Sequence, residues 1–147
     1  MTHLRPILVV EDNPKDLELT LAALKRSALA NPVVVTRDGA EALDYLHARG
    51  DWHERAAGDP AVVMLDLKLP KIDGLEVLER VKSDKALKQI PVVMLTSSRE
   101  ESDLVHSYEL GVNAFVVKPV EFSEFLKAIQ DLGMFWAVLN EPPPRRA

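Results

Sequence analysis

Five polar residues stand at the ends of apolar runs, where buried strands would meet solvent. They are Glu11, Asp12, Asp66, Thr96 and Lys118. Three carboxylates held close together repel one another unless a cation or protons intervene, and carboxylate oxygens favour a hard cation such as Mg²⁺. Mg²⁺ takes few protein ligands and leaves coordination positions open for a phosphoryl oxygen. The set therefore points to Mg²⁺-dependent phosphoryl chemistry.

The same residues could support phosphoryl transfer to the protein itself. An aspartate carboxylate can accept the group and form an aspartyl phosphate. Negative charge on the transferred group must be balanced from several sides, and the Lys118 ammonium and the Thr96 hydroxyl provide that balance opposite the metal. Asp66 closes a fully apolar run, a place where a carboxylate needs a partner.

Short apolar runs predict the strands that position these residues. The runs lie at 7–10, 33–35, 61–65, 91–95 and 114–117. They lack polar alternation, which is typical of strands buried on both faces of a parallel sheet. Apolar residues recur at helical spacing after each run, over about 14–27, 42–50, 74–81, 99–110 and 122–129. The pattern predicts an α/β fold, a doubly wound five-stranded parallel sheet with helices on both faces. In such a sheet the first and third strands are neighbours, so Glu11 and Asp12 are expected beside Asp66.

One stretch interrupts the alternation of strands and helices. Residues 50–60 are polar and form a longer connection than most helix-to-strand links. We expect a long surface loop here, which Trp52 packs against the domain.

Composition narrows the class of protein. The chain has 147 residues, no cysteine and a net charge of −5. Without cysteine there is no disulfide framework, which fits a cytoplasmic location. The charge offers no basic field for nucleic acid, and no apolar run is long enough for a signal peptide or a membrane span. We expect a soluble protein that binds neither nucleic acid nor membrane.

The length fits one domain. We predict a domain over residues 1–140, with an extended C-terminal segment at 133–140. Residues 141–147 contain three prolines and two arginines and are expected to form a disordered tail.

The spacing of these residues resembles that of a response-regulator receiver domain of two-component signalling. The resemblance rests on Glu11-Asp12, Asp66, Thr96-Ser97 and Lys118-Pro119, and on the turn 69–74, where Pro70 and Gly74 follow Asp66 by four and eight residues. It covers roughly residues 6–132. It implies the flavodoxin-like strand order 2-1-3-4-5 and a phosphoacceptor that is not an enzyme in the ordinary sense.

The resemblance also implies a role for each site residue. Asp66 would accept a phosphoryl group from a histidine kinase. The ligands of Mg²⁺ would be Asp12, Asp66 and the Lys68 carbonyl, and Glu11 would help through a bound water. Lys118 would contact the phosphoryl oxygens. Thr96 and Phe115 would form the conformational switch, with phenylalanine where many members have tyrosine.

A narrower resemblance concerns the partner. The long loop before the third strand, the segments 66–71 and 107–114 and the pair Phe135-Trp136 are similar to those of single-domain regulators paired with bacterial phytochrome kinases. This implies a red-light sensor kinase as partner and a stand-alone regulator that signals through protein contacts. The apolar residues at 132–139 fall too late to enter the sheet core. We therefore expect a homodimer through this segment and the fourth helix, fifth strand and fifth helix.

Other interpretations stay open at this point. Taken singly, Glu11 or Asp12 could be a helix N-cap, Lys118 a solvated lysine and Phe115 a core residue. A metal-dependent phosphohydrolase with an aspartyl phosphate would share the acceptor site, but it would need a second acid two residues after Asp66, where Lys68 stands. A receiver-like binding module that is never phosphorylated would be expected to lack Asp66 or Lys118. The four histidines show no zinc-binding spacing.

Overall fold

The computed structural model describes residues 5–26, 31–55, 58–96, 106, 108–112, 114–117 and 123–124. For Thr96 and residues 114–117 the description extends to the backbone alone. The predicted helices at 99–110 and 122–129 therefore lie largely outside the described residues, although residues 106, 108, 109, 123 and 124 are helical.

The described chain forms one five-stranded sheet. Its strands are β1 (Ile7–Val10), β2 (Val33–Thr36), β3 (Val62–Asp66), β4 (Val92–Thr96) and β5 (Ala114–Val117). They pair in the order β2-β1-β3-β4-β5, and all four pairings are parallel. The predicted order 2-1-3-4-5 is confirmed. Asp66 and Thr96 are the last residues of their strands.

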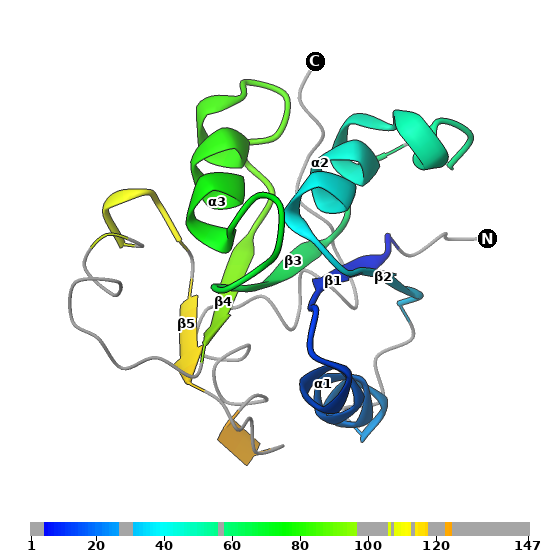
Figure 1. Ribbon diagram of the computed structural model, residues 1–147, viewed down its shortest axis with the longest axis vertical. Coiled ribbons are helices and arrows are strands. Elements are labelled where there is room, and N and C mark those ends of the chain that lie inside the picture. The colour runs from blue at the N-terminus through cyan, green and yellow to red at the C-terminus, as the bar shows by residue number, and fades with distance from the viewer. Residues whose placement is uncertain are drawn as a thin grey trace.

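Helices cover both faces of this sheet, as predicted. They are α1 (Pro14–Arg26), α2 (Gly39–His47) and α3 (Gly74–Ser83), with the short 3₁₀ helix η1 (Gly50–Trp52) after α2. Helix α1 lies on one face, whereas α2 and α3 lie side by side on the other (Figure 1). None of the helices within the described part of the chain is both long and apolar enough to cross a lipid bilayer.

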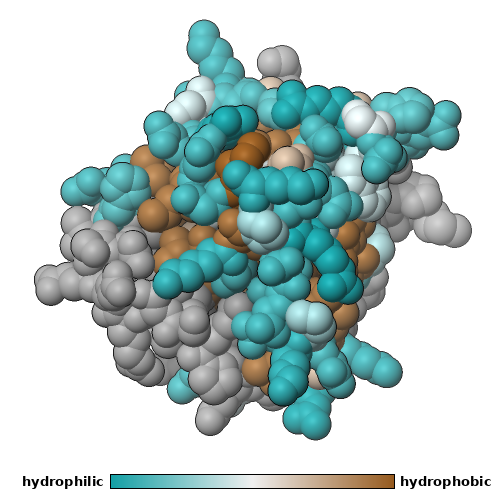
Figure 2. Space-filling view, viewed as in Figure 1, coloured by the Kyte–Doolittle hydropathy of each residue, from teal (hydrophilic) through white to brown (hydrophobic). Residues whose placement is uncertain are grey.

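The core is divided into two layers by the sheet. In β1, Leu8 and Val10 pack toward α2 and α3, and Ile7 and Val9 pack toward α1. Strands β3 and β4 alternate in the same way. Both faces of these strands are buried, which explains why their sequences are apolar without alternation. Hydrophilic side chains cover much of the described surface, and hydrophobic atoms show between them in patches (Figure 2).

The connection after α2 is tied to that helix. The Trp52 ring meets the Tyr45 ring edge-on, with centroids 5.1 Å apart, and Trp52 Nε1 donates to Glu41 Oε2 at 3.2 Å. The Arg55 guanidinium lies 4.6 Å from the Tyr45 ring centroid and donates to the carbonyls of Tyr45, Leu46 and Gly58. Burial raises the pKa of the Tyr45 phenol, and the Arg55 charge opposes this rise. The prediction that Trp52 packs this loop down is confirmed, and η1 adds a helical turn that periodicity does not indicate.

Candidate functional site

Asp66 occupies the carboxyl end of the central strand. It is the last residue of β3, which lies between β1 and β4, and 8% of it is exposed. The chain then stays close to the sheet, because Leu67 N donates to Leu95 O of β4 at 3.0 Å. A carboxylate held there is nearly enclosed by protein, yet it stands at the edge where parallel sheets bind ligands.

The residues after β1 divide into a buried acid and an exposed one. Glu11 is 1% exposed; its backbone N donates to Thr36 O at 3.0 Å, and its Oε2 accepts from Asn13 N at 3.2 Å. Asp12 is exposed. Within the described residues no hydrogen bond or ion pair engages the Asp12 carboxylate. Since β1 pairs with β3 through Val10 and Leu65, the two acids that follow Val10 leave β1 beside the end of β3.

The cap of α1 is Asn13, not Asp12. Asn13 Oδ1 accepts from Lys15 N at 2.9 Å and from Asp16 N at 3.1 Å, which satisfies two backbone donors of the first turn. The capping explanation of Asp12 is therefore wrong for this fold. Its carboxylate is left available for another partner.

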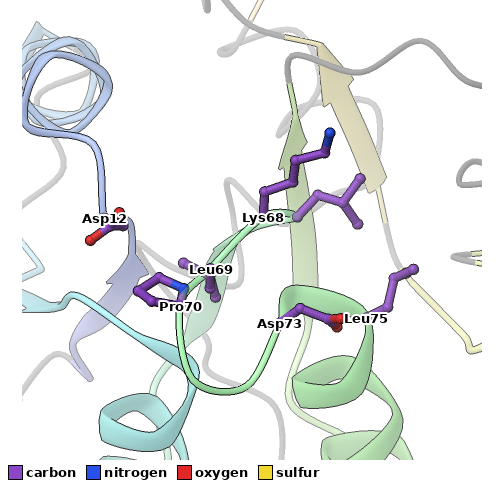
Figure 3. Close-up of a pocket in the computed structure, with 7 residues that line it drawn as sticks. Asp12, Lys68, Leu69, Pro70, Asp73 and Leu75 are labelled. Atoms are coloured by element: carbon purple, nitrogen blue, oxygen red, sulfur yellow. The ribbon is translucent and has the colours of Figure 1, made fainter.

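A pocket of about 480 Å³ lies beside these acids. It is lined by Asp12, Leu67, Lys68, Leu69, Pro70, Asp73 and Leu75. Asp12 faces the loop after β3 across this pocket, and Asp73 and Leu75 line it from the start of α3 (Figure 3). Asp66 immediately precedes the lining residue Leu67. The pocket therefore adjoins the carboxyl end of β3.

The loop between β3 and α3 turns back against the acceptor. Gly74 N donates to Leu67 O at 2.9 Å, and a Cβ built at Gly74 would lie 2.2 Å from Asp66 O. Asp73 caps α3, with Oδ1 accepting from Glu76 N at 3.0 Å. A side chain at position 74 would force the loop away from the acceptor. This gives a physical reason for the glycine that the resemblance pointed to.

The oxygen ligands predicted at this pocket suit a hard cation, although the described part of the protein does not surround the site with side-chain ligands. Among the residues described, no three His, Cys, Asp or Glu side chains group closely enough to hold a metal ion. Mg²⁺ does not require such a group, because it commonly takes one or two carboxylates and keeps several waters. Asp12 lines the pocket with a carboxylate, and Lys68 of the loop after β3 lines the same pocket. The predicted ligands Asp12, Asp66 and the Lys68 carbonyl therefore fit Mg²⁺ in kind.

Several predicted site residues fall outside the described part. Lys118 and the segment 132–139 lie outside it, as do the side chains of Thr96 and Phe115. The backbone pairs Thr96 with Val117, so the ends of β4 and β5 are adjacent, and Lys118 follows Val117 in sequence. Their assignments stay predictions.

Two residues that line the pocket beside the acids are not indicated as site residues by the sequence. These are Asp73 and Leu75. A signal for Asp73 was present, since an aspartate followed three residues later by Glu76 is typical of a helix start.

Known proteins with similar sequences and structures are response regulators. The sequence profile of the response regulator receiver domain matches residues 7–130. The bacteriophytochrome response regulator AtBRR is 74% identical in sequence, with a TM-score of 0.85 over 95% of this chain and 100% of that chain. Response regulator Rcp1 of Synechocystis sp. is 39% identical over 130 residues, which are 88% of this chain and 87% of Rcp1.

Two solved structures of relatives carry information on the site. The Mn²⁺-bound form of Rcp1 has a TM-score of 0.77 at 37% identity, over 97% of this chain and 99% of that chain. The phosphorylated cyanobacterial phytochrome response regulator RcpA has a TM-score of 0.76 at 41% identity, over 95% of this chain and 96% of that chain.

Proposed function

Because this chain belongs to the response regulator receiver domain family, we propose that it accepts a phosphoryl group on Asp66 from the phosphohistidine of a sensor kinase. The position of Asp66 carries the proposal. It is a nearly buried carboxylate at the end of β3, beside β1, the strand that Glu11 and Asp12 follow. The carboxylate of Asp12 lines the adjoining pocket and has no structural task of its own in the described residues.

The reaction transfers one group between two nucleophiles. An Asp66 carboxylate oxygen attacks phosphorus, the bond from phosphorus to the kinase histidine nitrogen breaks, and the electron pair returns to the imidazole. Mg²⁺, when bound, would neutralise charge on the phosphoryl oxygens. Asp12, Asp66 and the Lys68 carbonyl would hold it, and Glu11 would act through a water. Lys118 would bind the phosphoryl oxygens from the other side.

Relatives support both the modification and the partner. RcpA has been solved in a phosphorylated form and Rcp1 with Mn²⁺ bound, and AtBRR is a bacteriophytochrome response regulator. We propose that the kinase of this chain is likewise a bacteriophytochrome and that both act in the cytoplasm. Thr96 and Phe115 would carry the state of Asp66 to a protein partner, and no nucleic acid is involved.

A phosphohydrolase remains the second candidate in chemical terms. It would need a second acid two residues after Asp66 to protonate a leaving group. Lys68 is exposed and lines the pocket two residues after Asp66, and an ammonium is a poor acid for this step. The geometry favours a phosphoacceptor.

The decisive experiment is labelling by a small phosphodonor. The full chain is incubated with Mg²⁺ and acetyl phosphate, and its intact mass is measured before and after hydroxylamine. We expect one phosphoryl adduct that hydroxylamine removes. Asp66→Asn should abolish the adduct, because an amide keeps the shape but lacks the nucleophilic oxygen.

The matched control is Asp73→Asn. It makes the same change in another acid of the pocket, and asparagine caps a helix about as well as aspartate. This variant should label like the wild type. An unchanged adduct in Asp66→Asn would remove Asp66 from the mechanism.

A further inference from the structure

The start of α2 contacts the loop that follows the acceptor. Gly39 N donates to Pro70 O at 3.4 Å, and Lys71 Nζ lies 3.6 Å from Asp38 Oδ2. A Cβ built at Gly39 would lie 1.9 Å from Ile72 O and 2.9 Å from Ile72 Cβ. Real Cβ atoms do not approach a carbonyl oxygen so closely, so only glycine allows this contact. Helix α2 and the loop thus meet backbone to backbone.

The loop 67–73 is a closed unit whose shape depends on its surroundings. Its ends are joined by the bond from Gly74 N to Leu67 O, and Ile72 N donates to Pro70 O at 2.8 Å. At its tip Lys71 has φ of +67°, a left-handed conformation that is unfavourable for a residue other than glycine. Contacts outside the loop must therefore hold it.

Three kinds of contact could hold the loop, and they differ in strength. The ion pair from Lys71 to Asp38 is weak, because 69% of the Lys71 side chain is exposed and solvent screens it. The side chains of Leu69 and Ile72 pack on the core between the sheet and α2 and α3, but both are only partly buried. The Gly39 contact joins two backbones and cannot yield by rotating a side chain. It holds the tip of the loop, whereas the bonds from Leu67 N to Leu95 O and from Gly74 N to Leu67 O hold its ends.

We propose that Gly39 is a positioning residue for the metal site, because it holds loop 67–73 in the shape that presents the Lys68 carbonyl to the pocket shared with Asp12. This inference rests on the proposed function, in which that carbonyl is a ligand of Mg²⁺. Gly39 itself touches neither metal nor phosphoryl group. It acts from the neighbouring helix, through the loop.

The test is Gly39→Ala in the full chain. Gly39 is not in the left-handed region, and alanine favours helix more than glycine, so α2 itself should not suffer from the change. Calorimetry measures the dissociation constant of Mg²⁺ for the unphosphorylated protein, and circular dichroism checks folding. We expect the dissociation constant to rise about tenfold, the scale found when supports of metal ligands are lost. The Mg²⁺ concentration that half-saturates labelling by acetyl phosphate should rise by a similar factor, and the rate at saturating Mg²⁺ should fall less.

Two further variants separate positioning from general destabilisation. Ile7→Val trims a core residue at the opposite end of β1 and should leave the dissociation constant unchanged. Ile72→Ala removes the partly buried anchor of the loop and should raise it in the same direction as Gly39→Ala, by a smaller factor. If Gly39→Ala does not fold, Ile72→Ala against Ile7→Val decides.

The outcomes distinguish this inference from the proposed function. If the wild type binds Mg²⁺ and becomes labelled while folded Gly39→Ala and Ile72→Ala match it, the positioning role is wrong and the proposed function stands. An Ile7→Val variant that loses Mg²⁺ affinity equally would also overturn the positioning role. If the wild type neither binds Mg²⁺ nor becomes labelled, both fall.

Discussion

At the scale of single residues, the structure separates the roles of two neighbours, Asp12 and Asn13. Asn13 satisfies the first backbone donors of α1, and Asp12 lines the pocket beside the acceptor strand. A carboxylate with no structural duty can be changed without unfolding the helix. This makes Asp12 a clean residue for testing the metal site.

Asp12→Asn should weaken Mg²⁺ binding strongly. The amide keeps the size of the side chain but removes the anionic oxygen that a hard cation prefers, so we expect the dissociation constant to rise at least about tenfold. Calorimetry of the unphosphorylated protein measures it. Asp16→Asn is the control, because it neutralises a nearby acid in the first turn of α1 that lies outside the pocket. Equal Mg²⁺ affinity in Asp12→Asn and the wild type would contradict the ligand assignment.

At the scale of elements, the turn from β3 into α3 depends on a close approach of two backbones. A Cβ at Gly74 would lie 2.2 Å from Asp66 O and 2.7 Å from Leu67 O. Neither oxygen belongs to a side chain that could rotate away. The start of α3 therefore has to move if position 74 carries a side chain, and the residue after the acceptor moves with it.

Gly74→Ala should lower both stability and phosphoryl acceptance. Forcing an atom into a packed site costs about 1–3 kcal/mol, which urea denaturation would measure. We also expect the acetyl phosphate adduct to be strongly reduced. Val81→Ala is the control, because it truncates a buried residue at the other end of α3 at a comparable cost and should leave labelling intact. Full labelling of folded Gly74→Ala would show that the close approach is not needed.

The sequence predicts the strands well because each strand is marked by the apolar character of its own residues. Runs such as 7–10 are apolar throughout, and in the structure both of their faces are buried in the two core layers. The strand ends Asp66 and Thr96 follow from the same pattern. The order 2-1-3-4-5 comes from the resemblance to receiver domains, because the handedness of parallel connections alone allows several orders. The described α1, α2 and α3 agree with the predicted stripes, with boundaries that differ by a few residues.

What the sequence could not supply are contacts between elements. Nothing in the spacing of Gly39 and Ile72 shows that their backbones meet, because that depends on how α2 lies against the loop after β3. The cap of α1, by contrast, is predicted by the sequence, because Asn13 stands before Pro14 and proline is favoured at the first helical position; the structure confirms it. The packing of Trp52 is predictable, because a large aromatic residue in a polar loop buries its ring against the domain. The sequence does not predict that Tyr45 is the ring it contacts.

At the scale of the whole molecule, the open question is which surface carries the signal to a partner. Tyr108, in the region of the predicted fourth helix, is 60% exposed, an unusual degree for a large aromatic residue. The fourth helix is one of the segments through which we expect a homodimer; residues 132–139, another predicted segment, lie outside the described part. Aromatic residues are enriched at the centres of protein interfaces. The exposed Tyr108 thus supports an interface through this helix.

Phe135→Asp combined with Trp136→Asp should convert a homodimer to monomers. Charged residues at an apolar interface core lose hydration without gaining a partner, so association weakens. Sedimentation velocity at tens of micromolar protein measures the oligomeric state. Leu19→Asp is the control, because it places the same charge at an exposed apolar residue of α1. A wild type that sediments as a monomer under these conditions would show that the dimer prediction is wrong.

The strand order also bears on how the chain acquires its activity during synthesis. Strand β1 can pair with β2 as soon as both have emerged, but its other edge waits for β3, which follows α2 and the loop around Trp52. Pairings between distant segments form slowly, because the intervening chain must first be closed into a loop. The end of β1, which Asp12 follows, and the end of β3 at Asp66 are brought together only by this late β1–β3 pairing. Under the proposed function, a nascent or partly folded chain would therefore offer a kinase no working acceptor until the sheet is complete.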